Sequence, residues 1–121
     1  NLHGSLPAIP LPSFTGFHTA FANDDVPEYA FAQQVLGLGK PDDVLLAIST
    51  SGNSANVLHA AATAKVTGLK VIGLTGESGG KLAPLCDGAV RVPATDVARI
   101  QELHLPVYHV LCQMVEDALF D

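Results

Sequence analysis

Short, largely apolar runs along this chain alternate with segments in which apolar residues recur at helical spacing. The apolar runs lie at residues 44–48, 70–74 and 88–92. The helix-like segments lie at residues 54–66, 79–85 and 98–120. Strands that are apolar on both faces and alternate with helices are typical of a parallel sheet covered on both sides. The pattern therefore predicts an α/β fold, a three-layer α/β/α sandwich built around a parallel sheet.

The first part of the chain is less regular. Residues 8–9 lie between prolines and are predicted to form the centre of a short strand at a sheet edge, where proline is tolerated. Residues 13–23 are predicted to form a loop with a short aromatic turn. Pro27 suits the first position of a helix, which Gly37 and Gly39 are expected to end.

The last predicted helix carries one broad apolar stripe. Its members are Ile100, Leu103, Val107, Val110, Leu111, Met114, Val115 and Ala118. Such a stripe fits a core or a subunit interface better than a ligand site. Pro106 interrupts the stripe and frees the carbonyl of Glu102, so we expect a kink at Pro106 or a helix start just before it.

Composition narrows the class of protein. The chain has 121 residues, of which 48% are hydrophobic and 15% charged, and this predicts one modest globular domain. The net charge of −6 and the absence of a basic cluster argue against a nucleic-acid partner. Small anions remain possible ligands, because backbone N–H groups at a helix N-terminus can bind phosphate on an acidic protein. No apolar run reaches the roughly 20 residues that span a bilayer, so no membrane partner is expected.

Two cysteines bear on the cellular compartment. Cys86 and Cys112 lie far apart and fit no metal-binding or CxxC spacing. We therefore expect buried free thiols in a reducing cytosol.

An unusually polar turn follows the first apolar strand. Residues 49–54 read STSGNS, with four hydroxyls, a glycine and an amide. Ligands of parallel α/β sheets bind where such strand-to-helix turns gather. Gly52 permits close backbone approach, and Asn53 or Ser54 can cap the next helix. The turn predicts a phosphate site, although serines that merely cap the helix are the alternative. The turn at residues 75–80, TGESGG, is less distinctive and is read as a connector.

Two common phosphate-binding classes do not fit this turn. It lacks the GK[ST] ending and the lysine of a Walker P-loop, and it is not a GxGxxG sequence. The pattern therefore argues against nucleotide hydrolysis and dinucleotide redox chemistry.

In combination, three stretches resemble the sugar isomerase (SIS) domain family, and within it the phosphoheptose isomerases. They read AISTSGNSANV, then VIGLTGESGGKLA, and then ARIQELH followed by VYHVL. The similarity runs from about Asn23 to the C-terminus. It implies an enzyme that interconverts sedoheptulose 7-phosphate and D-glycero-D-manno-heptose 7-phosphate. It also implies a cytoplasmic homotetramer, often with zinc, whose active sites lie between subunits.

The resemblance also implies roles for individual residues. The sugar phosphate would be held by Ser49, Thr50, Ser51 and Ser54. Asn23 and Asp24 would lie near the sugar, and Gln101 would contact both substrate and metal. His109 would be a metal ligand and the catalytic acid/base.

Helix geometry is compatible with the last pair. Gln101 and His109 are eight residues apart, which is about two turns or roughly 12 Å between Cα atoms. Two long side chains that lean together can meet at one ion, at about 2 Å per ligand bond. His104 shares less of the Gln101 face and is interpreted as structural, and Glu102 as a solvated carboxylate. His3, His18 and His59 are read as surface or core residues.

Phosphoheptose isomerases carry a further strand, turn and helix upstream, and that helix supplies a histidine and a glutamate to the metal site. This chain begins after that part, so residues 1–121 are interpreted as a single SIS domain, the C-terminal portion of a longer chain. Two alternatives to the enzyme stay open. One is a non-catalytic SIS scaffold that associates with a replication initiator. The other is a phosphosugar-sensing module. His109 favours the enzyme, because binding members need not keep a metal-ligand histidine there.

Overall fold

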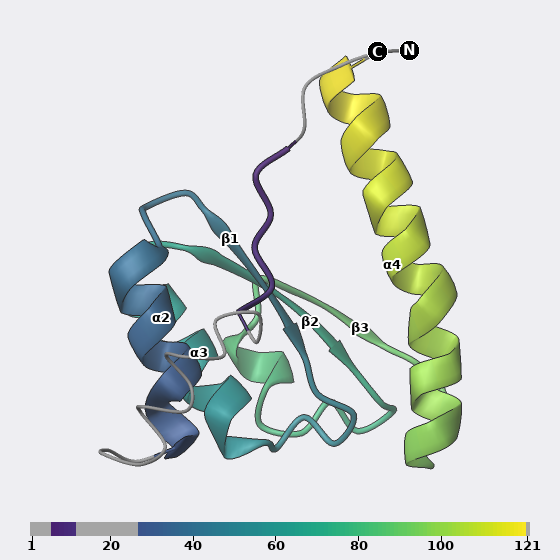
Figure 1. The fold of residues 1–121 in the computed structure, drawn as a ribbon. Helices are drawn as coiled ribbons and strands as arrows, with labels where there is room; N and C mark the ends of the chain where they lie inside the picture. The colour runs from purple at the N-terminus through teal and green to yellow at the C-terminus, as the bar shows by residue number, and fades with distance from the viewer. Residues whose placement is uncertain (1–5, 12–26, 121) are drawn as a thin grey trace.

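The computed structural model describes residues 6–11 and 27–120, which form an α/β fold around a three-stranded parallel sheet (Figure 1). The strands are β1 (Val44–Ile48), β2 (Lys70–Thr75) and β3 (Gly88–Arg91), in the order β1-β2-β3. Val44 pairs with Lys70, and Ile72 pairs with Gly88. The three strands predicted from the apolar runs are confirmed, and their carboxyl ends meet at one edge of the sheet.

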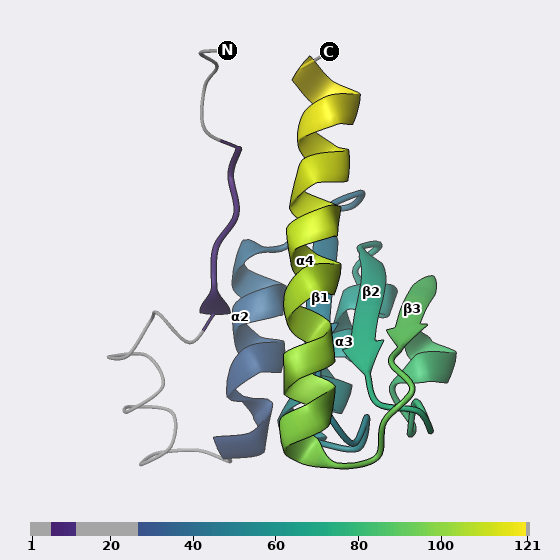
Figure 2. The ribbon, with the colours of Figure 1, turned by 90° about the vertical axis from the view of Figure 1, so that its right-hand side faces the viewer.

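Helices form a layer on each side of this sheet. A 3-10 turn, η2 (Pro27–Tyr29), leads into α2 (Ala30–Leu38), and α3 (Ala55–Val66) joins β1 to β2. After β3 the chain forms α4 (Val97–Phe120). Figures 1 and 2 show α2 and α3 together on one side of the sheet and α4 on the other. This arrangement confirms the predicted fold class.

The main core lies between the sheet and the pair α2 and α3. It is formed by Val35, Ala47, Ala60, Ala61, Ala64, Leu69, Val71 and Leu82. Alanines at three positions of α3 leave room for the helix to approach the strands closely. Val71 and Leu82 are among the largest fully buried side chains, and each such burial stabilises the fold by about 1.5–3 kcal/mol.

The opposite face of β1 is only partly covered, which differs from the prediction of a strand buried on both faces. Val44, Leu46 and Ile48 are 59%, 44% and 49% exposed, whereas Ala47 is buried and Leu45 packs on the core. Successive side chains of a strand point to opposite faces, so one face of β1 contacts α2 and α3. No part of residues 6–11 and 27–120 buries the other face of β1, which carries Val44, Leu46 and Ile48.

Contact between α4 and the sheet is also sparse. Only Ile100 and His104 of this helix are buried. Farther along, an apolar cleft of about 400 Å³ opens between β3 and α4. It is lined by Val90, Pro106, Val107, Val110, Leu111 and Met114. The predicted stripe therefore lies against the sheet at one end and borders an open cleft at the other.

Two local predictions are wrong, and one of the two alternatives expected at Pro106 is excluded. Residues 6–10 contain no strand, since Pro7 and Pro10 lack the N–H donors that a ladder needs. Residues 79–85 form only the 3-10 turn η3 (Ala83–Leu85), because Gly79 and Gly80 adopt φ of +75° and +55°, outside the helical region. No helix starts just before Pro106, because α4 begins at Val97 and runs through it.

The exposure of the two cysteine side chains differs from the prediction that both are buried. Both are free thiols, as expected, but neither is fully buried: Cys86 is half-buried and Cys112 lies exposed on α4. No helix among the described residues has both the length and the apolar character needed to cross a membrane.

Candidate functional site

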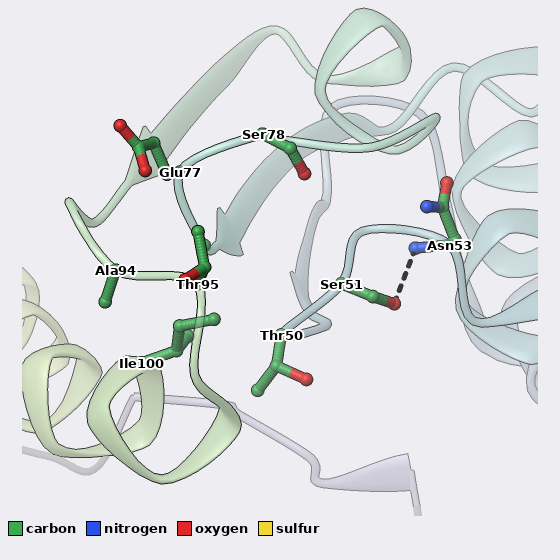
Figure 3. A pocket seen from close by; sticks show the side chains of 9 residues that line it. Thr50, Ser51, Asn53, Glu77, Ser78, Ala94, Thr95 and Ile100 are labelled. Carbon is green, nitrogen blue, oxygen red and sulfur yellow. Dashed lines mark hydrogen bonds between the residues drawn. The ribbon is translucent and has the colours of Figure 1, made fainter.

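A cavity of about 250 Å³ lies at the carboxyl ends of the three strands (Figure 3). Its walls are the three connections that leave β1, β2 and β3. It is lined by Thr50, Ser51, Asn53, Gly76, Glu77, Ser78, Ala94, Thr95 and Ile100. Small-molecule sites commonly enclose about 300–1,000 Å³, so this cavity suits one end of a small polar molecule.

The first two connections interlock through their backbones. Gly76 N–H donates to the Thr50 carbonyl at 3.0 Å, and Leu82 N–H donates to the Gly52 carbonyl at 2.9 Å. Gly52 has φ of +72°, and a Cβ there would collide with the Gly79 carbonyl. Only glycine allows this approach, so the turn predicted as a phosphate site is fixed in shape by its neighbour.

The hydroxyls of the first turn bond mainly within it. Ser49 Oγ is buried, accepts the Gly52 N–H at 3.1 Å and lies 3.0 Å from Ser54 Oγ. Ser51 Oγ accepts the Asn53 N–H at 3.1 Å. Ser54 occupies the N-cap position of α3, as predicted, but its side chain makes no capping bond. Helix capping therefore does not account for the Ser54 hydroxyl.

These bonds leave hydrogen-bonding capacity toward the cavity. A serine hydroxyl has one proton to donate and two positions that accept. Ser49 and Ser54 together carry two protons, and their mutual bond uses one. Ser51 accepts one bond and keeps its own proton. At the start of α3 the Val57 N–H donates to Asn56 Oδ1 at 2.8 Å, whereas the N–H groups of Ala55 and Asn56 come before the first intrahelical bond and follow this turn directly in the chain.

The third wall comes from the connection between β3 and α4. Glu77 N–H donates to the Ala94 carbonyl at 3.0 Å, which ties this segment to the second turn. Asp96 caps the N-terminus of α4, since its carboxylate accepts the Arg99 N–H at 3.0 Å. Ile100, in the first turn of α4, is buried and closes the cavity floor.

Electrostatically the cavity relies on neutral groups. Glu77 is the one charged residue among the described residues that line it. The neighbouring Arg91 donates Nε and Nη2 to the Glu77 carbonyl, at 2.9 and 2.6 Å. That guanidinium holds the second turn in place. An anion in the cavity would meet hydroxyls, amides and a helix N-terminus, which can stabilise phosphate without a lysine.

The site residues predicted from the sequence fall into two groups. Thr50 and Ser51 line the cavity, while Ser49 and Ser54 support the same turn. Gln101 is exposed and follows Ile100 directly. Asn23 and Asp24 lie outside the described residues.

His109 lies two turns beyond Gln101 on α4. It is exposed, and its ring stacks on Tyr108 with centroids 5.4 Å apart. Neither Gln101 nor His109 lines the cavity itself.

The other histidines behave as structural residues. His104 is buried, with Nε2 2.9 Å from the Thr75 carbonyl oxygen. His59 is half-buried and packs on Tyr29, with ring centroids 4.4 Å apart. His3 and His18 lie outside the described residues.

A full zinc site is not present within the described residues. They contain no group of three or more His, Cys, Asp or Glu side chains that could hold a metal. Catalytic zinc usually has three protein ligands, and the predicted pair Gln101 and His109 would supply two. A complete ligand set therefore needs groups beyond the described part of the chain.

Sequence reasoning missed much of the cavity lining. Gly76, Glu77, Ser78, Ala94, Thr95 and Ile100 were not assigned to a site. A usable signal existed, because each segment follows a strand of one parallel sheet and must lie at the same edge. The second turn was noticed but interpreted as a connector.

Comparison with known proteins adds independent information. The SIS domain family matches residues 7–76. A phosphoheptose isomerase of Rhodospirillum rubrum is 51% identical over 114 residues, which cover 94% of this chain and 61% of that protein. One from Nitratiruptor is 48% identical, with the same two coverages.

Solved structures agree with the sequence matches. A phosphoheptose isomerase from Francisella tularensis superimposes with a TM-score of 0.90 at 42% identity, covering 95% of this chain and 62% of that one. One from Neisseria gonorrhoeae gives 0.85 at 42% identity, covering 88% and 61%. The chain thus spans about three fifths of the length of these relatives.

Proposed function

This chain belongs to the SIS domain family, and we propose that it forms part of a phosphoheptose isomerase. The proposed reaction converts sedoheptulose 7-phosphate to D-glycero-D-manno-heptose 7-phosphate. The cavity at the carboxyl edge of the sheet is the observation that carries the proposal, because its neutral donors suit a phosphate. Relatives named phosphoheptose isomerase, one of them 51% identical to this chain, support the choice of substrate.

In the proposed mechanism the first turn binds and does not react. Thr50 and Ser51 donate hydroxyl protons to the phosphate, with Ser54 and the first N–H groups of α3 beside them. Binding energy from the phosphate then orients the sugar along α4. Asn23 and Asp24 are proposed to contact the sugar.

The chemical step moves one proton between adjacent carbons. A base takes a proton from C1 of the ketose, and the electrons form an enediol between C1 and C2. The proton returns to C2, while a proton moves from the C1 hydroxyl to the C2 oxygen. We assign the acid/base role to His109, since an imidazole can both accept and donate a proton and this ring is exposed on α4, the helix whose first turn closes the cavity.

Zinc is a proposed cofactor, with Gln101 and His109 as two of its ligands. Bound zinc would polarise the substrate carbonyl. The remaining ligands must come from outside the described residues, as Gln101 and His109 alone fall short of a zinc ligand set.

Assembly into a homotetramer, with active sites between subunits, is proposed as well. Exposed apolar side chains on β1 and α4 support it, since apolar surface of this kind is usually covered by other protein. Location in the cytoplasm is proposed from the two free thiols among the described residues.

Replacing His109 tests the proposed function. His109→Ala in the full-length protein should abolish turnover of sedoheptulose 7-phosphate while phosphosugar binding stays measurable. Gln113→Ala, which changes an exposed residue of the same helix, is the matched control and should keep its turnover. Turnover retained by His109→Ala would refute the role of His109. A wild-type protein that binds the phosphosugar but never isomerises it would be a non-catalytic SIS module.

A further inference from the structure

Helix α4 is anchored to the rest of the protein by two buried side chains. Ile100 and His104 are the only buried residues of its 24. They are four residues apart, so they lie one above the other on the same face. Figure 2 shows the helix crossing in front of the sheet. The positions of the other α4 side chains relative to the sheet therefore depend on the contacts that Ile100 and His104 make.

His104 makes a directed polar contact with β2. Its Nε2 lies 2.9 Å from the carbonyl oxygen of Thr75. A carbonyl oxygen can only accept, so Nε2 carries the proton. The same oxygen accepts the Val92 N–H at 3.1 Å, and Thr75 is fully buried. The histidine therefore bonds to a fully buried residue of the sheet whose carbonyl is already hydrogen-bonded to Val92.

This bond is adjacent to the candidate site. Thr75 is the last residue of β2, and Gly76, which follows it, lines the cavity. A Cβ on Gly76 would come within 2.5 Å of Ile100 Cδ1, so α4 contacts the turn closely there. The two anchors thus attach α4 to the floor of the cavity at successive points.

The anchor sets where the reacting groups lie. Gln101 precedes His104 by three residues and His109 follows it by five, which is within about 8 Å along the helix axis. Contact through Ile100 alone would permit rotation and sliding, because apolar packing is not directional. A hydrogen bond to a fixed carbonyl defines both the height and the rotation of α4.

We propose that His104 is a positioning residue for the isomerisation: its Nε2–H bond to Thr75 fixes the height and rotation of α4, and with them the positions of Gln101 and His109 relative to the cavity. This rests on the proposed function. Phosphate binding should depend little on the bond between His104 and Thr75, because the second turn is also held by hydrogen bonds from Gly76 N–H and Glu77 N–H to other carbonyls.

The test compares two substitutions in the full-length protein. His104→Gln can place an amide N–H where Nε2 lies, whereas His104→Asn is too short to reach Thr75. For each variant we would measure kcat and KM with sedoheptulose 7-phosphate, affinity for inorganic phosphate, and the thermal unfolding midpoint. Gln113→Ala is the control on the exposed side of α4.

We expect His104→Asn to lose about 10- to 100-fold in kcat, since misplacement by about 1 Å can cost this much. Its phosphate affinity should stay within about threefold of wild type. His104→Gln should recover most of the kcat. A purely structural role would instead lower kcat and phosphate affinity together, in step with the unfolding midpoint.

Three results would overturn the inference. His104→Asn could keep wild-type kcat, His104→Gln could be no better than His104→Asn, or phosphate affinity could fall as far as kcat. If His104→Asn fails to fold, the glutamine variant decides, because a folded His104→Gln protein without turnover contradicts the positioning role. Absence of turnover in the wild type would refute the proposed function itself, and with it this role.

Discussion

The hydroxyl oxygens of Ser49 and Ser54 lie 3.0 Å apart, so a side-chain hydrogen bond spans the turn between β1 and α3. Ser49 is buried and also accepts the Gly52 N–H, whereas Ser54 is exposed. The two serines therefore have different roles in the turn. Ser49 supports its shape from within, and Ser54 keeps capacity for a ligand.

Ser49→Ala should lower the free energy of unfolding by about 1 kcal/mol, because a buried acceptor of a backbone N–H is lost. Ser54→Ala should cost less, since its side chain is exposed and water can replace the bond. Urea denaturation of both variants measures the difference. An equal or larger loss for Ser54→Ala would contradict this division.

Ligand binding should depend on the outward-facing hydroxyls. Ser51→Ala combined with Ser54→Ala should weaken phosphosugar affinity at least about tenfold, because a hydrogen bond to a charged group contributes about 1.5–3 kcal/mol. Calorimetric titration with the phosphosugar measures this loss of affinity. Thr67→Val is the control, because the Thr67 hydroxyl bonds only to α3 carbonyls in the described structure, away from the cavity. Unchanged affinity in the double variant would show that phosphate binds elsewhere.

Gly52 should not tolerate a side chain. Gly52→Ala forces φ of +72° on an L-residue and brings a Cβ against the Gly79 carbonyl. The strained φ alone costs about 1–2 kcal/mol, and the collision should add to it and reduce phosphate affinity. Gly37→Ala is the matched control, because it lies in α2 with nothing within 4 Å of its Cβ.

Thermal unfolding separates the two glycine variants. Gly37→Ala should raise the free energy of unfolding by about 0.5–1 kcal/mol, because alanine is the better helix former. A Gly52→Ala protein with the stability and phosphate affinity of the wild type would mean that the two turns are not interlocked.

The cysteines should differ in reactivity. Burial raises the pKa of the Cys86 thiol, the charge of Asp87 raises it further, and Lys65 partly offsets both. A raised pKa means less thiolate at a given pH, and the thiolate is the reactive form. Iodoacetamide at pH 8 should therefore modify the exposed Cys112 first and Cys86 slowly, with Cys86 gaining as the pH rises. Mass spectrometry of timed samples measures this, and faster modification of Cys86 would contradict it.

The sequence predicted the strands and long helices well because their signals are local. The run that forms β1 is apolar along its whole length, β2 carries its apolar residues between Lys70 and Thr75, and α3 ends near Gly68, as expected. The helix predicted at residues 79–85 does not form because of tertiary packing. Gly80 adopts φ of +55° in order to approach the Ser51 carbonyl of the neighbouring turn, and no local pattern reports such packing.

The candidate site was predictable only in part. Thr50 and Ser51 could be assigned because their turn is chemically unusual and follows a buried strand. Ile100 could not, because in the sequence it is one apolar residue of a stripe. Its place in the cavity depends on how α4 crosses the sheet, which His104 and Thr75 fix across 29 residues of chain.

The most direct test of the central claim is isomerisation in deuterated water. The full-length protein is incubated with sedoheptulose 7-phosphate, and the products are followed by NMR. We predict that an aldoheptose 7-phosphate forms and carries deuterium at C2, because the transferred proton exchanges with solvent on the base. Unchanged ketose, in the presence of zinc and with the phosphosugar demonstrably bound, would contradict the assignment as an isomerase.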